Sequence, residues 1–295
     1  MDLAFTRRLL TAADHAYAIT GNGPVPPRAM PKSPYGSGTV GYTSGPLGFV
    51  SGTDKINAGF VAAIPEGVLL VVRGTTPPQD ADEQLVRDWI NNAMLQPVSA
   101  HGFAGQMHSG FYASFFDLWL MGAFGRQARA LIAERPADEP IYLAGHSKGG
   151  PVVRLIARRL RVDYPHRPIV VRSWGAPSVG DEAFAANYAG AELDDKRYEY
   201  LDDAVPHLPL QPTMLGALGL DPIALALLSA LLADYTPVGE LRYIDQHGVV
   251  GPDAPGLEGM RLLRLIHRIQ AADFLGIANC HRTEAGMGYA TAGYP

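Results

Sequence analysis

The segment 141–150 holds the residues whose types and spacing best suit covalent chemistry. Four strand-forming residues, Ile-Tyr-Leu-Ala, run into Gly145-His-Ser147-Lys-Gly149 and then into a helix-like segment. A Cβ at either of the two glycines would crowd a tight strand-to-helix turn that exposes the serine hydroxyl. Backbone N–H groups at the start of the following helix stabilise negative charge developing beside that hydroxyl. The pattern predicts Ser147 as a nucleophile; a glycine-rich turn with an incidental serine is the alternative.

A serine nucleophile needs an acid and a base, and candidates for both occur later in the chain. Asp202 and Asp203 follow a strand-like segment at 197–201, and His281 lies in a predicted glycine-flanked loop near the end of the chain. Parallel sheets gather reactive groups at the carboxyl ends of their strands. The order Ser, Asp, His is that of α/β-hydrolases. The Asp-x-Val-Pro pattern favours Asp203 as the acid, with Asp202 as its competitor, and His247 is the main rival base.

Backbone and hydroxyl donors for an oxyanion are predicted at the end of another strand. The segment 71–76, Val-Val-Arg-Gly-Thr-Thr, is apolar until Gly74, where the backbone can approach the site closely. Thr75 offers both an N–H and an O–H group. Thr75 and the backbone N–H of Lys148 are therefore predicted to face the oxyanion of a tetrahedral intermediate.

Other reactive side chains receive structural interpretations. His146 is expected to point away from the chemistry of Ser147, and His207 is expected at the mouth of the cleft. Cys280 adjoins His281, but neighbouring residues seldom face each other, so a thiol nucleophile is disfavoured. The scattered histidines lack close metal-ligand spacing, so neither a metal nor a cofactor is predicted.

Alternating strands and helices are predicted to position these groups. Apolar segments at 58–64 and 68–73 flank Pro65-Glu66-Gly67 and predict a hairpin. Further strands are predicted at 142–144, 168–174 and 197–201, with helices at 148–161 and 181–189. The N-terminus predicts an amphipathic helix, 21–48 an irregular surface segment, and 111–135 one long helix. This order predicts an α/β fold with a mostly parallel central sheet and helices on both faces.

Composition limits the class of protein. The 295 residues, 47% hydrophobic and 18% charged, fit a single domain over 1–295. A net charge of −5 provides no basic field, so nucleic-acid binding is not expected. One cysteine excludes an intramolecular disulfide and is compatible with a reducing compartment. Neither a signal peptide nor a transmembrane segment is recognised, which leaves a cytoplasmic protein or export by another route.

The motifs together resemble the class 3, fungal-type lipase family. They appear in the family's order and cover roughly 54–209. The matching motifs are Arg73-Gly-Thr75 with Asp88-Trp89-Ile90, His108-Ser-Gly-Phe111, the elbow at 145–150, Trp174-Gly-Ala-Pro-Ser-Val-Gly-Asp181, and Asp203-Ala-Val-Pro-His-Leu-Pro209. The resemblance implies an α/β-hydrolase fold with Ser147 as nucleophile, Asp203 as acid, His281 as base, and Thr75 with Lys148 as oxyanion donors.

The resemblance also implies a movable lid within 76–95. Its part at 77–88 is acidic, so the apolar face that drives activation at lipid interfaces is reduced. A leucine-rich insert at 211–236, with a predicted helix at 221–233, is either a core helix, a wall of the acyl pocket or a membrane-touching cap. Family members often carry leucine where this chain has Lys148, and the secreted fungal members are disulfide-bonded.

The sequence therefore predicts a serine carboxylic-ester hydrolase, a lipase or esterase, that favours short to medium acyl chains. A long-chain triacylglycerol lipase or a phospholipase A1 would use the same residues. The predicted partners are a small ester or lipid substrate and a transient lipid interface. A non-catalytic binding protein of the same fold is the alternative from another class.

Overall fold

The computed structural model describes residues 3–26, 40–52, 55–75, 97–209, 235–271, 273–283 and 288–290. The predicted lid at 76–95 and the predicted helix at 221–233 lie outside these residues. Of the insert at 211–236, only the last two residues are described, and they form the short strand β11, Tyr235–Thr236.

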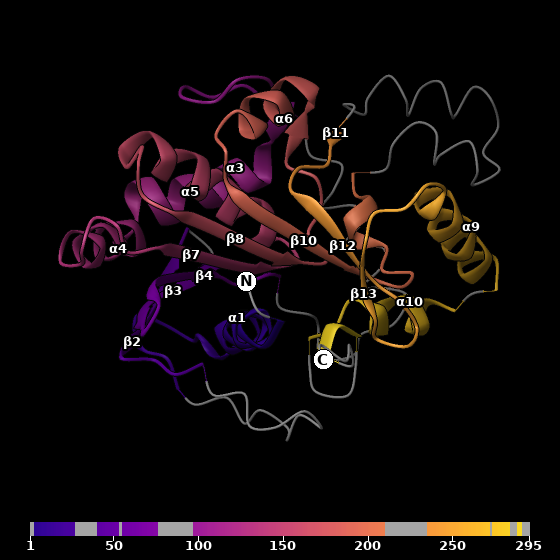
Figure 1. Cartoon of the computed structure of the whole chain (residues 1–295), viewed down its shortest axis with the longest axis horizontal. Coiled ribbons are helices and arrows are strands. Elements are labelled where there is room, and N and C mark those ends of the chain that lie inside the picture. Colours follow the sequence, from indigo (N-terminus) through magenta and orange to yellow (C-terminus); the bar gives the residue numbers. More distant parts are fainter. Residues whose placement is uncertain are drawn as a thin grey trace.

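A mixed sheet runs through the described part of the chain (Figure 1). Its order is β1-β2-β3-β4-β7-β8-β10-β12-β13, in which β4, β7, β8, β10 and β12 are parallel neighbours and the outer pairs are antiparallel. The strands are β1 Gly23–Pro24, β2 Ser44–Ser51, β3 Asn57–Ile64, β4 Gly67–Val72, β7 Ile141–His146, β8 Ile169–Trp174, β10 Asp194–Tyr200, β12 Glu240–Ile244 and β13 Val250–Pro252. The predicted hairpin is confirmed as β3 and β4.

Helices cover both faces of this sheet. Helix α1 lies on one face, and α3, α4 and α5 lie on the other (Figure 1). The helices are α1 Leu3–His15, α3 Ser109–Phe115, α4 Ala123–Ala133, α5 Gly149–Asp163, α6 Glu182–Ala189, α9 Leu257–Gln270 and α10 Phe274–Cys280. Single 3₁₀ turns occur at Ala16–Ala18, Val205–His207 and Gly288–Ala290. A second, small sheet joins β11 to β9 Gly180–Asp181, β6 Met107–His108 and β5 Pro97–Val98. The predicted α/β architecture is confirmed.

Strands β3, β4, β7 and β8 are buried along their whole length, which explains their largely apolar sequences. In β4, Leu70 and Val72 pack into the cluster under α3, α4 and α5. Leu69 and Val71 point to the opposite face and pack into the cluster that contains α1. Successive residues of one strand thus pack into two hydrophobic cores, one on each face of the sheet.

The prediction of one long helix at 111–135 is wrong. The helix α3 widens into a π-helical segment, Phe116–Met121, and the chain then breaks at Gly122 before α4. The apolar pattern of the sequence continues across the break, so the sequence does not reveal it. The consecutive residues Leu118 and Trp119 are both fully buried there. A Cβ at Gly122 would lie 2.5 Å from the carbonyl oxygen of Asp117. The absence of a side chain there allows the wide turn to close.

The prediction that 21–48 lacks regular structure is also wrong. Within its described residues the segment includes β1 and the first half of β2, which pairs antiparallel with β3. Gly48 lies within β2 because a Cβ there would be only 3.0 Å from Val25 and 3.2 Å from Ile19. A glycine that disfavours a strand by propensity is needed here for close approach.

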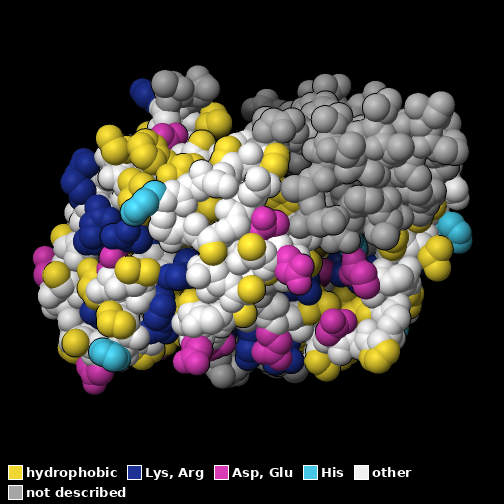
Figure 2. Space-filling model, turned by 90° about the horizontal axis from the view of Figure 1, so that it is seen from above, with side chains coloured by type: hydrophobic (Ala, Val, Ile, Leu, Met, Phe, Trp, Pro, Cys, Tyr) yellow, Lys and Arg dark blue, Asp and Glu magenta, His cyan; other side chains and the backbone are white. Residues whose placement is uncertain are grey.

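The surface carries mixed charge. On the face shown in Figure 2, acidic, basic and hydrophobic side chains are interspersed, and basic ones are densest toward α4 and α5. Many of these charges are neutralised locally, as where Arg159 pairs with Asp163 at 3.0 Å. In the part of the chain that the structure describes, the helices are too short or too polar to cross a bilayer.

Candidate active site

Ser147 occupies the sharp turn between β7 and α5. Its φ of 54° lies in the left-handed region, which is rare for residues other than glycine. The turn is held by Ser147 N–H, which donates to the carbonyl of Trp174 at 2.9 Å. A Cβ on Gly145 would lie 2.5 Å from the backbone of Gly149, so the turn requires glycine as the sequence predicts. Strained backbone of this kind is typical of functional sites.

Asp203 and His281 form a buried pair. His281 Nδ1 lies 2.8 Å from Asp203 Oδ2 and 3.1 Å from Oδ1. Asp203 also accepts hydrogen bonds from the backbone N–H of Val205 at 3.0 Å and from the Tyr289 hydroxyl at 2.7 Å. Burial alone would raise the pKa of Asp203, but His281 and these hydrogen bonds outweigh it and lower the pKa. Asp203 therefore stays ionised and orients the imidazole.

The competing acid, Asp202, faces away from this pair. Its carboxylate accepts from Arg268 at 2.7 Å and lies 3.3 Å from Arg264, both on α9. Consecutive residues thus point in different directions, one carboxylate toward α9 and the other, that of Asp203, toward His281.

The rival base, His247, lies away from these acids in the turn between β12 and β13. Its side chain is exposed, and its backbone N–H donates to Asp245 within the same turn. His281 is instead the C-cap of α10. The prediction of a glycine-flanked loop at 278–282 is wrong for its first three residues, because α10 extends to Cys280 and His281 follows as its C-cap.

His146 packs beside the Asp203–His281 pair. Its contacts agree with the predicted structural role, but the sequence did not predict that it lies next to this pair. Its Nδ1 lies 2.7 Å from the hydroxyl of Tyr17, and its Nε2 lies 2.7 Å from the carbonyl of His281. Its ring lies 4.5 Å from that of His281. Burial, together with a smaller effect of the nearby His281, lowers the pKa of His146 to about 3. A neutral His146 thus supports His281 without adding charge.

The end of β4 approaches the Ser147 turn closely. A Cβ on Gly74 would lie 2.8 Å from Ser147 Cβ and would collide with the Tyr17 hydroxyl. Thr75 follows directly and is exposed. Lys148 begins α5 as its N-cap residue, with its backbone N–H at the turn. The two predicted oxyanion donors are therefore on the two segments that meet at Gly74.

The prediction that His207 lines the mouth of a cleft is wrong. Its side chain is buried, and its Nδ1 lies 2.9 Å from Glu258 on α9. This hydrogen bond lowers the pKa of Glu258 to about 2. The sequence could not reveal this pairing, because the two residues belong to segments separated along the chain and joined only by the fold.

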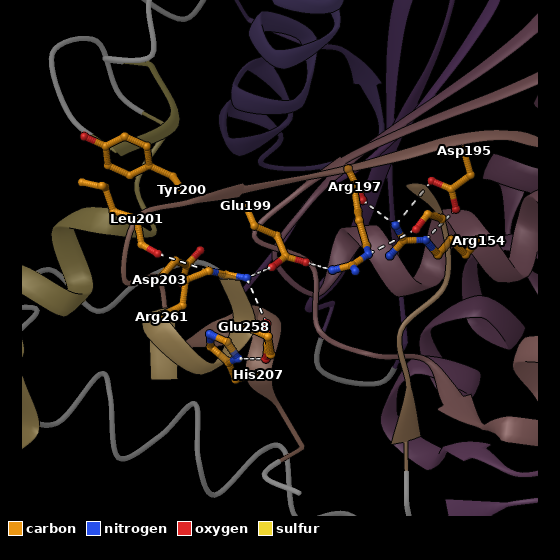
Figure 3. Close-up of polar contacts among 12 residues, drawn as sticks. Arg154, Asp195, Arg197, Glu199, Tyr200, Leu201, Asp203, His207, Glu258 and Arg261 are labelled. Carbon is orange, nitrogen blue, oxygen red and sulfur yellow. Dashed lines mark hydrogen bonds and ion pairs between the residues drawn. The ribbon is translucent and has the colours of Figure 1, made fainter. Parts of the chain in front are cut away.

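His207 is the end of a row of polar and charged side chains that runs through α9 to β10 (Figure 3). Glu258 contacts Arg261, which is completely buried and pairs with Glu199, and Glu199 in turn pairs with Arg197. Arg261 also donates to the carbonyl of Leu201 at 3.3 Å.

Leu201 has a positive φ of 42° and stands two residues before Asp203. The row thus holds the strained backbone that leads to the buried acid.

Cys280 adjoins His281 in the chain but is no candidate nucleophile. It is buried, and burial raises the pKa of its thiol to about 11. Within the described ranges, no group of three or more His, Cys, Asp or Glu side chains could hold a metal ion.

The sheet, its covering helices and the Ser147 turn are those of the α/β-hydrolase fold. Solved structures agree: the Rhizomucor miehei lipase propeptide complex has 21% identity and a TM-score of 0.58 over 81% of this chain and 67% of that chain. A triacylglycerol lipase whose catalytic centre is described as a serine protease triad has 20% identity and a TM-score of 0.61, over 83% of this chain and 81% of that chain. At these identities the likeness shows the fold alone.

Residues 69–213 match the class 3 lipases. The predicted resemblance to the class 3 lipase family is confirmed over this segment. Lipase A of Sodiomyces alcalophilus is 34% identical over 35% of this chain and 27% of its own length. The secreted mono- and diacylglycerol lipase 1 of Fusarium solani is 31% identical over 44% of this chain and 38% of its own length. The matches thus span less than two fifths of each of these relatives.

Proposed function

We propose that the protein is a serine carboxylic-ester hydrolase in which Ser147, His281 and Asp203 form the catalytic triad. The observation that carries the proposal is the buried Asp203–His281 pair beside the left-handed turn at Ser147. A neutral His281 accepts the proton of Ser147 as the hydroxyl attacks the ester carbonyl. Asp203 holds the imidazole tautomer and stabilises the cation that forms.

The oxyanion would be held by Thr75 and the backbone N–H of Lys148, which directly follow Gly74 and Ser147, two residues that lie close together. Collapse of the tetrahedral intermediate expels the alcohol, which takes its proton from His281, and leaves an acyl group on Ser147. Water, activated by His281, then attacks this acyl-enzyme and releases the carboxylic acid. The same residues serve both halves of the reaction.

A fluorophosphonate probe and a soluble p-nitrophenyl ester test the proposal. Wild-type protein is expected to be labelled at Ser147 and to hydrolyse the ester. Ser147→Ala is expected to abolish labelling and to lower kcat by about 10⁶-fold. A purified variant with activity within about tenfold of wild type would remove Ser147 from this role. An inert wild-type protein with an intact fold would favour the non-catalytic alternative.

For the substrate, we propose acylglycerols or related esters with short to medium acyl chains. Two of the relatives are called mono- and diacylglycerol lipases, which supports glycerides as a substrate class. If the acidic segment 76–88 covers the cleft, it offers little apolar surface to a lipid interface, so activity should rise smoothly through the solubility limit of an ester. Rates on acetyl to palmitoyl esters, and on mono-, di- and triglycerides, test the preference. A sharp jump on emulsified triolein would contradict it.

A further inference from the structure

The residue after Ser147 has a charged side chain that reaches across the sheet. Lys148 Nζ donates to Asn57 Oδ1 at 2.9 Å, and Asn57 is the buried first residue of β3. The sheet order is β3, β4, β7, and Lys148 follows β7. The Lys148 side chain therefore spans β4, from the strand on one side to the strand on the other.

The strand that it spans carries the other proposed oxyanion donor. Beside Asn57, the carbonyl of Ala58 accepts a hydrogen bond from the N–H of Arg73 at 2.9 Å. Two residues beyond Arg73 is Thr75, where the ladder between β4 and β7 has already ended at Val72. The Lys148–Asn57 hydrogen bond thus helps to connect the segments that carry Thr75 and Lys148. It does so beyond the last backbone pairing between β4 and β7.

Asn57 is itself fixed by two further contacts. Its Oδ1 also accepts from the Ser114 hydroxyl at 2.8 Å, and its Nδ2 donates to Asp117 Oδ2 at 2.9 Å. Asp117 lies in the π-helical segment after α3. The wide turn of that segment brings the Asp117 carboxylate to Asn57, on the side opposite Lys148. Segments of π-helix often occur at functional sites.

The charge of the Lys148 side chain depends on pH. Burial and the nearby Arg73, opposed in part by Asp117, together lower the pKa of Lys148 to about 8. The other groups facing Lys148, Asn57 on β3 and Ser114 on α3, do not titrate. A charged donor forms a stronger hydrogen bond than a neutral amine, so the link weakens as pH rises through 8.

We propose that the Lys148 side chain is a positioning residue that holds the two oxyanion donors at a fixed separation, and that hydrolysis weakens at alkaline pH when this side chain loses its proton. The proposal rests on the proposed ester hydrolase function. It concerns the side chain, since the backbone N–H of Lys148 is present in every variant. An imidazole base remains active when neutral, so His281 does not account for an alkaline loss of activity.

The test is kcat and KM for p-nitrophenyl butyrate between pH 6 and 10, with spontaneous hydrolysis subtracted. Wild type should lose kcat with a midpoint near pH 8. Lys148→Met removes the donor and keeps much of the aliphatic chain. Its kcat at pH 7 should fall by up to about tenfold, with KM nearly unchanged. The decline in kcat near pH 8 should be absent from this variant.

Asp117→Asn gives an independent measurement with Lys148 intact. Removing the carboxylate that raises the Lys148 pKa should move the midpoint to lower pH, by about half a unit or more. The matched control is Lys55→Gln, which removes one positive charge from an exposed position two residues before Asn57. Its profile should coincide with that of wild type.

The outcomes separate this proposal from the proposed function. An alkaline decline that persists in Lys148→Met, or that stays in place in Asp117→Asn, overturns the role of Lys148 while the hydrolase assignment stands. A Lys148→Met variant that fails to unfold cooperatively is set aside, and the Asp117→Asn profile decides. A folded wild-type protein that hydrolyses no ester and resists fluorophosphonate overturns both.

Discussion

Gly175 stands directly under the Asp203–His281 pair, and replacing it with alanine gives a sharp test of that pair. The added Cβ would lie 2.7 Å from both Asp203 Oδ2 and His281 Nδ1. Ordinary contacts begin near 3.4 Å, so each atom would have to move by about 0.7 Å. The two atoms are 2.8 Å apart, and such a movement opens the hydrogen bond beyond its normal range.

The expected loss of activity follows from this displacement. Misplacing a catalytic group by about 1 Å costs about 10²-fold, and losing the oriented histidine tautomer costs about 10⁴-fold in kcat. Gly175→Ala should therefore lower kcat by about 10² to 10⁴-fold with little change in KM. Its φ of 55° adds a backbone cost of about 1 to 2 kcal/mol, to be measured by urea unfolding.

A matched control separates strain from collision. Gly102 has a φ of 91°, but no atom lies within 4 Å of its added Cβ. Gly102→Ala should lose comparable stability and keep its kcat. If Gly175→Ala hydrolyses p-nitrophenyl butyrate as fast as this control does, the contact between Asp203 and His281 is irrelevant to turnover and the reasoning fails.

Thr75→Val removes a hydroxyl and keeps the shape, so kcat should fall by about 10² to 10³-fold in steady-state assays; an unchanged kcat would limit Thr75 to its backbone N–H. His146 stays neutral down to about pH 3 in the fold but titrates near 6.5 when unfolded, so folding stability should decline as pH falls from 6.5. In His146→Gln, urea unfolding should show this slope reduced by up to about 1.4 kcal/mol per pH unit, whereas an equal slope would mean that another group titrates. Arg261→Met leaves Glu199 buried without this partner and should cost about 3 to 5 kcal/mol, while adding Glu199→Leu should restore much of it; a double variant less stable than either single one would contradict this account.

The alternation of strands and helices was predictable because buried parallel strands leave continuous apolar segments between helix patterns. The long helix at 111–135 was mispredicted because hydrophobic spacing averages over a turn. One widened turn with Leu118 and Trp119 both buried hardly changes that average. Where a helix breaks depends on the collision a side chain at Gly122 would cause, and this becomes visible only when the turn is built.

For the candidate site, local pattern sufficed at Ser147, because the glycines and the turn belong to one short segment. The distinction between Asp202 and Asp203 has another origin. It depends on Arg268 and His281, which lie 66 and 78 residues further along the chain. Tyr17 and Tyr289 have no local signature at all, since each acts through a single hydroxyl brought to the site by the fold.

The contacts of the N-terminal helix bear on where this polypeptide can be cut. The family match covers 69–213, yet Tyr17, which touches His146, and His281 both lie outside it. Asp14, on the same N-terminal helix, accepts a buried hydrogen bond at 2.9 Å from Thr283, so segments 269 residues apart are in direct contact. A recombinant fragment trimmed to the matched residues would lack α1, β3 and His281, and with them one covering layer, a strand neighbour and the imidazole. The segment that matches the family is thus shorter than the segment that must be expressed as one polypeptide. A fragment cut at 69 and 213 would keep Ser147 but lose the helix, the strand and the histidine that surround it.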